Sequence, residues 1–349
     1  MKAQTKELKI SEDRYSRQIL FGEIGREGQE RIRASRVLIV GCGALGTAQA
    51  EALSRAGVGR LRIADRDFVE NTNLQRQTMF TEDDAAARMP KAIAAAKHIA
   101  EINSEIKVEP EVVDVNHSNI ERLVRGCDLV LDGTDNFTTR YLLNDACVKH
   151  QVNWIYGAAV GSYGVTMTIQ PHQTACLRCV FEEAPPAATT PTCDTAGVIM
   201  PIISVVAAVQ VSEALKLLTN SYDDLHRSLM QFDVWRNEWR KINPGPPAAD
   251  CPTCALGHYD TLEPTAGAFS AVLCGRNAVQ VSPPQITKVD FASLAARLNP
   301  HGEVKFNEYL LRFQTGDFEL TVFQDGRSII RGTDDPTVAR SLYAKYIGN

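Results

Sequence analysis

Short apolar runs alternate with longer amphipathic stretches over residues 36–158. The short runs have the length and β-branched content of buried strands, and the longer ones repeat apolar residues at helical spacing. Strands are predicted at 37–40, 60–65, 107–115, 128–132 and 152–158, and helices at 43–57, 90–103, 117–125 and 136–149. This alternation predicts an α/β fold with a Rossmann-like, mostly parallel sheet that carries helices on both faces.

The pattern changes after residue 158. Tyr163–Gln170 and Ser228–Val234 alternate apolar and polar positions, so antiparallel strands should continue the sheet. The apolar segment 201–219 between them is expected to be a buried helix, too short and too polar at one end to span a bilayer. Glu182–Thr195 is rich in Pro, Ala and Thr and should be a surface loop.

These patterns divide the chain into an N-terminal helical segment (1–35), a nucleotide-binding domain (36–256) and a small C-terminal α+β domain (265–349). The last is expected in the order β-α-β-β-β-α, and no dense polar cluster assigns it a role. Its predicted strands are 271–281, 309–313, 318–323 and 328–331, the last two forming a hairpin at Asp325-Gly326, and its helices are 290–298 and 335–347.

Composition narrows the class of protein. The formal net charge of −5 argues against broad nucleic-acid binding, which needs a basic face. The first residues lack the apolar core of a secretory signal, so we expect a cytoplasmic protein with no membrane partner. In a reducing compartment, the nine cysteines point to metal or thiol chemistry rather than to disulfides.

A glycine-rich loop follows the first predicted strand. Gly41, Gly43 and Gly46 form a GxGxxG pattern, which allows a tight turn and lets the backbone and a helix N-terminus approach a phosphate. Asp65 ends the next strand, where a ribose-binding carboxylate is expected. Taken alone, this loop and Asp65 would indicate an NAD-dependent oxidoreductase.

Cationic and amide side chains come next. Asn73 and Arg76 are three residues apart, so on one helical turn they should project the same way. Lys91 follows Pro90 at the start of a predicted helix, a position that favours anions. Each alone would be read as a solvated surface residue, but together after the glycine loop they favour phosphate binding.

A further polar group follows the predicted strand that ends at Asp132. Asp135 lies where a carboxylate could hold Mg²⁺ beside phosphates, although Asp135 or Asn136 could instead cap the following helix. Asp132 itself is interpreted as structural. Because Gly41, Asp65 and this turn all follow strand ends, they should converge on one crevice.

Two CxxC pairs are the strongest local signal. Cys176, Cys179, Cys251 and Cys254 offer four thiolates from two turns, the ligand set of a tetrahedral Zn²⁺ site. Four protein ligands leave no open position, so the zinc would be structural. The alternative is a redox-active or incidental pair of motifs.

Cys193 stands apart from the other cysteines because it lies in a polar, Pro-containing loop just before the apolar helix. A thiolate there could reach a substrate, so the sequence leaves the residue balanced between nucleophile and bystander. The remaining cysteines, Cys42, Cys127, Cys147 and Cys274, are expected to be inert packing residues.

Together these residues resemble the ThiF/MoeB/HesA family, bacterial relatives of the ubiquitin-activating enzymes. The resemblance covers about residues 10–256. The matching segments are Arg14–Gln18, Gly41–Gly46, Asp65–Asp67, Asn73–Gln77, Pro90-Lys91, Asp132–Asn136, the two CxxC pairs and Thr192–Val198.

The resemblance implies an ATP-binding adenylation domain with a zinc clamp. Its substrate would be the C-terminal glycine carboxylate of a ubiquitin-like sulfur carrier protein ending in Gly-Gly, adenylated with MgATP and release of pyrophosphate. By the same resemblance, Asp65 would bind the ribose, Asn73, Arg76 and Lys91 the phosphates, and Asp135 the Mg²⁺.

The resemblance also implies a homodimer, in which Arg17 would reach phosphate from the partner subunit. Cys193 matches a position that in some members forms a thioester or acyl-disulfide with the carrier. Residues 265–349 lack a rhodanese-like CxxGxR loop, so the source of sulfur stays open, with a separate persulfide donor as one candidate.

Three questions stay open at the level of sequence. The carrier could serve the molybdopterin, thiamine, cysteine or tRNA-thiolation pathway. An NAD-dependent oxidoreductase is the rival enzyme, but it gives Arg76, Lys91 and the CxxC cysteines no task. A non-catalytic, zinc-stabilised scaffold that binds a ubiquitin-like partner is the other alternative.

Overall fold

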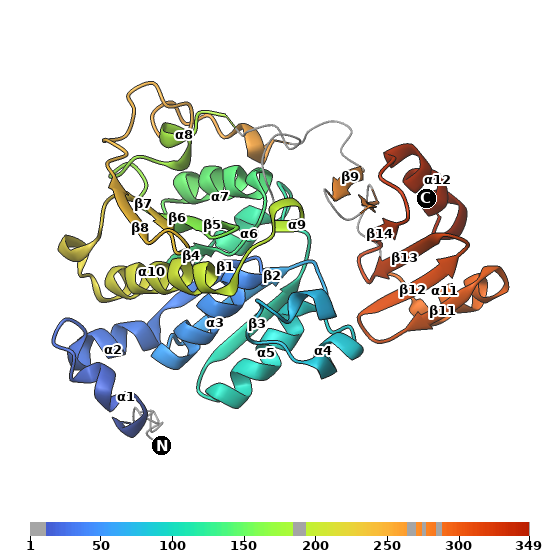
Figure 1. Ribbon diagram of the computed structural model, residues 1–349, viewed down its shortest axis with the longest axis horizontal. Coiled ribbons are helices and arrows are strands. Elements are labelled where there is room, and N and C mark those ends of the chain that lie inside the picture. Colours follow the sequence, from blue (N-terminus) through green and yellow to red (C-terminus); the bar gives the residue numbers. More distant parts are fainter. Residues whose placement is uncertain (1–11, 184–192, 264–269, 274–276, 284–287, 349) are drawn as a thin grey trace, which may run out of the picture. The chain divides into compact units, whose positions relative to one another are not determined.

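The computed structural model describes residues 12–183, 193–263, 270–273, 277–283 and 288–348 (Figure 1). These residues form two compact units, the first within 12–263 and the second within 270–348. Each unit has its own sheet and its own hydrophobic core.

The first unit is built on an eight-stranded sheet of order β3-β2-β1-β4-β5-β6-β7-β8. Its first five strands pair in parallel and its last three in antiparallel fashion, which confirms the predicted fold class. The strands are β1 Arg36–Val40, β2 Arg60–Asp65, β3 Lys107–Val112, β4 Leu129–Asp132, β5 Asn153–Val160, β6 Tyr163–Ile169, β7 Leu229–Asp233 and β8 Glu238–Ile242.

Helices cover both faces of this sheet (Figure 1). Alternate residues of β1 face opposite ways, so Val37 and Ile39 pack with α3, α5 and α10, while Leu38 and Val40 pack with α6 and α7. The helices are α3 Ala44–Ala56, α5 Lys91–Ile102, α6 Ile120–Val124, α7 Phe137–His150 and α10 Met200–Thr219. The shorter ones are α1 Glu12–Ile19, α2 Gly25–Ala34, α4 Glu82–Ala86, α8 Leu177–Val180 and α9 Cys193–Ala196.

Three sequence predictions about this unit need correction. Strand 107–115 ends at Val112 and helix 117–125 begins at Ile120. The edge strand β8 was not predicted, because all five of its residues are exposed and show no alternation. The apolar helix is not too short: among the described residues, α10 alone has the length and hydropathy to cross a membrane, yet it packs across the sheet as a core helix.

The second unit is a six-stranded antiparallel sheet of order β11-β12-β13-β14-β10-β9, with α11 Phe291–Leu298 and α12 Pro336–Tyr346 packed into one core. The predicted strand 271–281 is wrong, since it is two antiparallel strands separated by a turn. Asn277 at that turn has a positive φ of 45°, a conformation that Asn tolerates well. The strands are β9 Ser270–Leu273, β10 Ala278–Val281, β11 Glu303–Phe306, β12 Leu310–Thr315, β13 Phe318–Phe323 and β14 Ser328–Arg331.

The predicted order of this unit also changes. It is β-β-α-β-β-β-β-α, because β11 was missed as well. That strand has only four residues and is mostly exposed, so its alternation of polar and apolar residues is too short to stand out. The hairpin of β13 and β14 is confirmed.

Candidate functional site

The site lies at the carboxyl ends of β1 and β4, which are neighbours in the sheet although two other strands come between them in sequence. Connections leave β1 and β4 in opposite directions along the sheet, so a crevice opens between them. The loop 41–46 follows β1, and the turn 133–136 follows β4. The predicted convergence of these two segments therefore has a topological basis.

The two loops pack backbone against backbone. Gly41 has a φ of +86°, and a Cβ there would lie 2.7 Å from the Gly133 carbonyl oxygen. A Cβ on Gly46 would overlap the Gly41 carbonyl oxygen. Gly43 differs, because the nearest atoms to its Cβ position are 3.9 Å away. Gly41 and Gly46 are thus required by the fold, whereas a Cβ on Gly43, at the start of α3, would make only ordinary van der Waals contacts.

Asp65 lies against this glycine loop. Its Oδ2 accepts a hydrogen bond from the backbone N–H of Cys42 at 2.5 Å, and its Oδ1 accepts one from the N–H of Asp67 at 2.6 Å. Burial raises the pKa of Asp65, although the Lys91 ammonium and the two hydrogen bonds oppose that shift. The carboxylate is therefore fixed beside the loop.

Lys91 begins α5, with Pro90 as the N-cap residue. Its side chain is buried, and Nζ lies 3.6 Å from Asp67 Oδ2. A buried ammonium is costly without a partner, so this position is not a solvated surface. Lys91, Asp67 and Asp65 form one charge cluster next to the glycine loop.

Asn73 and Arg76 occupy one turn but differ in exposure. Asn73 ends the 3₁₀ helix η1 Asn71–Asn73, is buried, and accepts a hydrogen bond from the Glu70 N–H through Oδ1. Arg76 is only half-buried, and its Nη1 donates to the Thr72 carbonyl. The capping bond therefore holds Asn73 inside the turn, whereas Arg76 is partly open to solvent.

The turn after β4 separates two roles that the sequence left open. Asn136 caps α7 by accepting a hydrogen bond from the Thr139 N–H at 2.9 Å. Asp135 is exposed and does not cap the helix. An exposed carboxylate at this strand end suits Mg²⁺, which prefers oxygen ligands and keeps several waters.

Asp132 is buried, and its carboxylate is fully used by the protein. Oδ1 accepts from the N–H and the hydroxyl of Thr134, and Oδ2 accepts from Arg140 Nε at 3.1 Å. Arg140 also donates to the carbonyls of Thr134 and Gly157. The Asp132–Arg140 pair therefore holds the turn in place, in agreement with the structural interpretation. Arg140 was missed, although a single arginine in a buried helical stretch was a usable signal.

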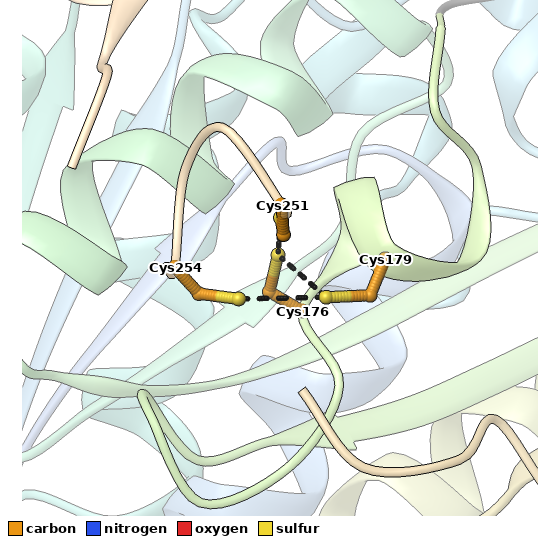
Figure 2. Close-up of side chains that lie close together, drawn as sticks. All are labelled: Cys176, Cys179, Cys251 and Cys254. Atoms are coloured by element: carbon orange, nitrogen blue, oxygen red, sulfur yellow. Dashed lines mark hydrogen bonds between the residues drawn. The ribbon is translucent and has the colours of Figure 1, made fainter. Parts of the chain in front are cut away.

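The four CxxC cysteines come together between the start of α8 and the segment after β8 (Figure 2). Their sulfur atoms lie within 4.8 Å of one another, with 3.6 Å between Cys176 and Cys251 and 3.4 Å between Cys179 and Cys254. Ligands about 2.3 Å from a tetrahedral Zn²⁺ are about 3.8 Å apart, whereas a disulfide needs about 2.05 Å. The cluster fits zinc and not two disulfides.

Two buried residues of α7 support this cluster. Asn144 accepts a hydrogen bond from the Leu177 N–H and donates to Cys176 Sγ, and Asp145 accepts from the hydroxyls of Thr253 and Thr261. Sulfur ligands are normally fixed by such outer contacts. The chain after β8 is thereby fastened to the helix layer of the first unit.

Cys193 is the first residue of α9, and only its backbone is described. The chain just beyond is anchored, since Gly161 and the segment 197–199 exchange two backbone hydrogen bonds of 2.8 and 3.0 Å. Most of the predicted loop 182–195 lies outside the described residues, as does Cys274. Burial raises the pKa of the Cys42, Cys127 and Cys147 thiols, which fits inert packing residues.

Arg17 lies far from the glycine loop of its own chain. Helix α1 is attached to the far ends of α3 and α5, where Gln18 donates to the Ala56 carbonyl and Arg14 to the Ile102 carbonyl. The glycine loop is at the other end of α3, whose 13 residues span about 20 Å. Arg17 is exposed and cannot join the crevice of its own chain.

The sequence of this chain is similar to a known protein family and to several known proteins. Residues 15–253 match the ThiF family. The chain is 45% identical over 337 residues to the sulfur carrier protein ThiS adenylyltransferase of Bacillus subtilis, covering 96% of this chain and 99% of that protein. It is 40% identical over 251 residues to the SAMP-activating enzyme E1 of Haloferax volcanii, covering 72% and 92%.

Among solved structures, E. coli MccB with ATP matches with a TM-score of 0.62 and 23% identity, over 69% of this chain and 74% of that one. At this identity the likeness concerns the fold. The family match ends at residue 253, whereas the Bacillus relative also spans the second unit.

Proposed function

The chain belongs to the ThiF family and is an adenylyltransferase, and on that premise we propose that it uses ATP to adenylate the C-terminal carboxylate of a ubiquitin-like sulfur carrier protein ending in Gly-Gly. The observation that carries the proposal is the crevice between β1 and β4. It joins the uncrowded backbone of Gly43 at the start of α3 to the Lys91–Asp67–Asp65 charge cluster.

In this proposal the crevice binds the nucleotide in three parts. Asp65 accepts hydrogen bonds from the ribose hydroxyls. The backbone N–H groups at the start of α3, together with Lys91 and Arg76, hold the phosphates. Asn73 shapes the turn from which Arg76 projects. Asp135 would hold Mg²⁺, which supplies charge neutralisation when bound.

The reaction needs alignment and charge neutralisation more than proton transfer. A carboxylate oxygen of the carrier attacks the α-phosphorus of ATP, the bond to the bridging oxygen breaks, and pyrophosphate leaves. The product is an acyl-adenylate whose AMP is a good leaving group. Fixed cations at the developing phosphate charge are the main way that a protein accelerates such a step.

We assign the second step to Cys193. Its thiolate attacks the acyl carbonyl of the adenylate, AMP leaves, and a thioester forms. If a persulfide donor has first loaded Cys193 with a second sulfur, the same attack gives an acyl-disulfide instead. The residue opens α9, next to the anchored segment 197–199 beside the end of β5.

The proposed enzyme is a homodimer in which each crevice receives Arg17 from the partner subunit. Arg17 lies on the far side of its own chain, so only a second chain can bring it to a crevice. The turn after α1 exposes Leu20 (74%) and Phe21 (57%), an apolar pair suited to such a contact. The CxxC cluster is proposed as a structural zinc site.

We further propose that the carrier is a ThiS-like protein. The relative that spans almost all of this chain, the second unit included, is named for that carrier, whereas the Haloferax relative matches over 251 residues. The second unit would therefore belong to the version of the enzyme that serves this carrier.

ATP–pyrophosphate exchange tests the proposed function. Labelled pyrophosphate should enter ATP only when a carrier ending in Gly-Gly is present, and a carrier lacking its last glycine is the matched control. Exchange without carrier, or none with any such carrier, would refute the proposal. Binding of NADH in place of ATP would favour an oxidoreductase.

A further inference from the structure

Gln77 is a buried glutamine of the first unit. Its side chain is 3% exposed, and Oε1 has no hydrogen-bond partner among the described residues. Oε1 of the buried Gln49 is also unpartnered, but Nε2 of Gln49 donates to the Asp132 carbonyl and to Gln210, whereas Nε2 of Gln77 donates to no described residue. The buried Gln210 behaves differently, since its Nε2 donates to the Asp132 and Ile155 carbonyls and its Oε1 accepts from Gln49. Gln29 likewise has partners at both ends of its amide.

The surroundings of Gln77 indicate what its amide faces. Its Nε2 lies 3.9 Å from the position that a Cβ on Gly43 would occupy. Gly43 lies at the N-terminus of α3 and is the one glycine of the loop where a Cβ would meet only ordinary van der Waals contacts, so the fold leaves room beside it. Gly43 caps α3 without any side-chain hydrogen bond, so the first N–H groups of the helix point at the same space.

The backbone of Gln77 is held firmly. Its N–H donates to the Asn73 carbonyl at 2.9 Å, its own carbonyl accepts from the Phe80 N–H, and Met79 and Phe80 are buried in the core. The amide is therefore presented to the loop by a rigid turn. Nε2 is the end of the amide that lies nearest to Gly43.

We propose that Gln77 is a substrate-binding residue whose amide N–H donates to a phosphate oxygen of the nucleotide over Gly43. A neutral donor adds a hydrogen bond to the phosphate at a point where the cations Lys91 and Arg76 supply charge. Nε2 has no acceptor among the described residues, so a phosphate oxygen beside Gly43 would supply one, while Oε1 stays without a partner. This inference rests on the proposed ATP site and deepens it.

Binding of a non-hydrolysable ATP analogue by calorimetry tests this role. Gln77→Leu should weaken binding of the analogue about tenfold and leave adenosine binding unchanged, because only the phosphate contact is lost. Gln77→Glu keeps the shape, adds repulsion, and should weaken the analogue further. Gln75→Leu, an exposed glutamine of the same turn, is the matched control and should bind as the wild type does.

Thermal unfolding separates this role from a structural one. Replacing an unpartnered buried amide by leucine should leave the melting temperature unchanged or higher. A folded Gln77→Leu protein with unchanged affinity for the analogue would overturn the proposal, as would an equal loss for adenosine. Failure of the wild-type protein to bind the analogue would instead refute the ATP site as a whole.

Discussion

Lys91 Nζ lies 3.6 Å from Asp67 Oδ2, and the backbone N–H of Asp67 donates to the Asp65 carboxylate. The lysine proposed for phosphate and the aspartate proposed for ribose are thus connected through one residue. The sequence alone gives no sign that Asp67 links the lysine to the aspartate. Their connection means that the charge cluster is assembled before any nucleotide arrives, which lowers the reorganisation that binding requires.

Lys91→Met should lower the carrier-dependent exchange rate about 100-fold or more, because a fixed cation at the reacting phosphate is lost. Lys97→Met on the same helix is the matched control, since Lys97 is exposed and is not one of the residues proposed for the site. A loss limited to the KM for ATP, with kcat unchanged, would place Lys91 in ground-state binding alone.

Arg17→Ala should abolish exchange, but mixed dimers should recover part of it. In a dimer of one Arg17→Ala chain and one Lys91→Met chain, one crevice has both its own Lys91 and the Arg17 of the other chain. Co-expression of the two variants should therefore restore about a quarter of the wild-type rate. No recovery in a purified mixed dimer would contradict the proposal that Arg17 acts across the interface.

Elemental analysis of the purified protein should find about one zinc per chain, because four thiolates make one closed site. Cys254→Ser should lose the zinc and several kcal/mol of stability, about the scale on which zinc binding supports small folds. Cys127→Ser is the control, since Cys127 is half-buried and lies outside the cluster. A metal-free protein of unchanged stability would show the cluster to be incidental.

Cys193→Ala should abolish a carrier adduct that thiols release, while carrier-dependent exchange continues. Adenylation precedes the attack of the thiolate, so the two steps separate cleanly. Mass spectrometry of the intact chain after incubation with carrier and ATP measures the adduct. An adduct of the same mass in the variant would remove Cys193 from the mechanism.

The contribution of Asp84 to stability should depend on pH. Burial acts to raise the pKa of Asp84, but hydrogen bonds from His98 and Thr81 outweigh it and hold the pKa below its usual value of about 3.9. The carboxylate therefore stabilises the folded protein fully above that usual value and loses this effect as the pH falls through the folded pKa.

Asp84→Asn should accordingly lower the free energy of unfolding by about 1–3 kcal/mol near pH 7, with a smaller difference below about pH 4. Asp83→Asn is the matched control, because Asp83 is exposed in the same helix. Urea unfolding at several pH values measures both. A difference in the free energy of unfolding that grows as the pH falls would show that the ionised Asp84 carboxylate does not stabilise the folded protein.

Local patterns predicted the parallel half of the sheet well, because buried strands and amphipathic helices each leave a periodic signal. They failed at β8, whose five exposed residues show no alternation, and at β11, whose alternation spans only four residues. They also failed near Asn277, where the Gly-Arg-Asn signal of a chain reversal was overlooked. The glycine loop was predicted from its GxGxxG pattern. The structure explains two of these glycines, since a Cβ on Gly41 or Gly46 would clash with nearby backbone atoms.

The arrangement around the loop was harder to predict. The differing exposure of Asn73 and Arg76 depends on a capping bond to Glu70, and the Asp132–Arg140 pair depends on how α7 packs. Gln77 was present in a recognised motif, yet its unpartnered amide becomes visible only when the tertiary contacts are known. The spacing of motifs identifies candidate residues. The role of each candidate depends on contacts with residues that are distant in sequence.

The separate cores of the two units have a calorimetric consequence. A chain with two independent cores melts in two cooperative steps, so its heating curve should resolve one transition for residues 12–263 and another for residues 270–348. The proposed nucleotide and zinc sites both lie in the first unit, so saturation with either should displace one calorimetric peak and leave the other in place.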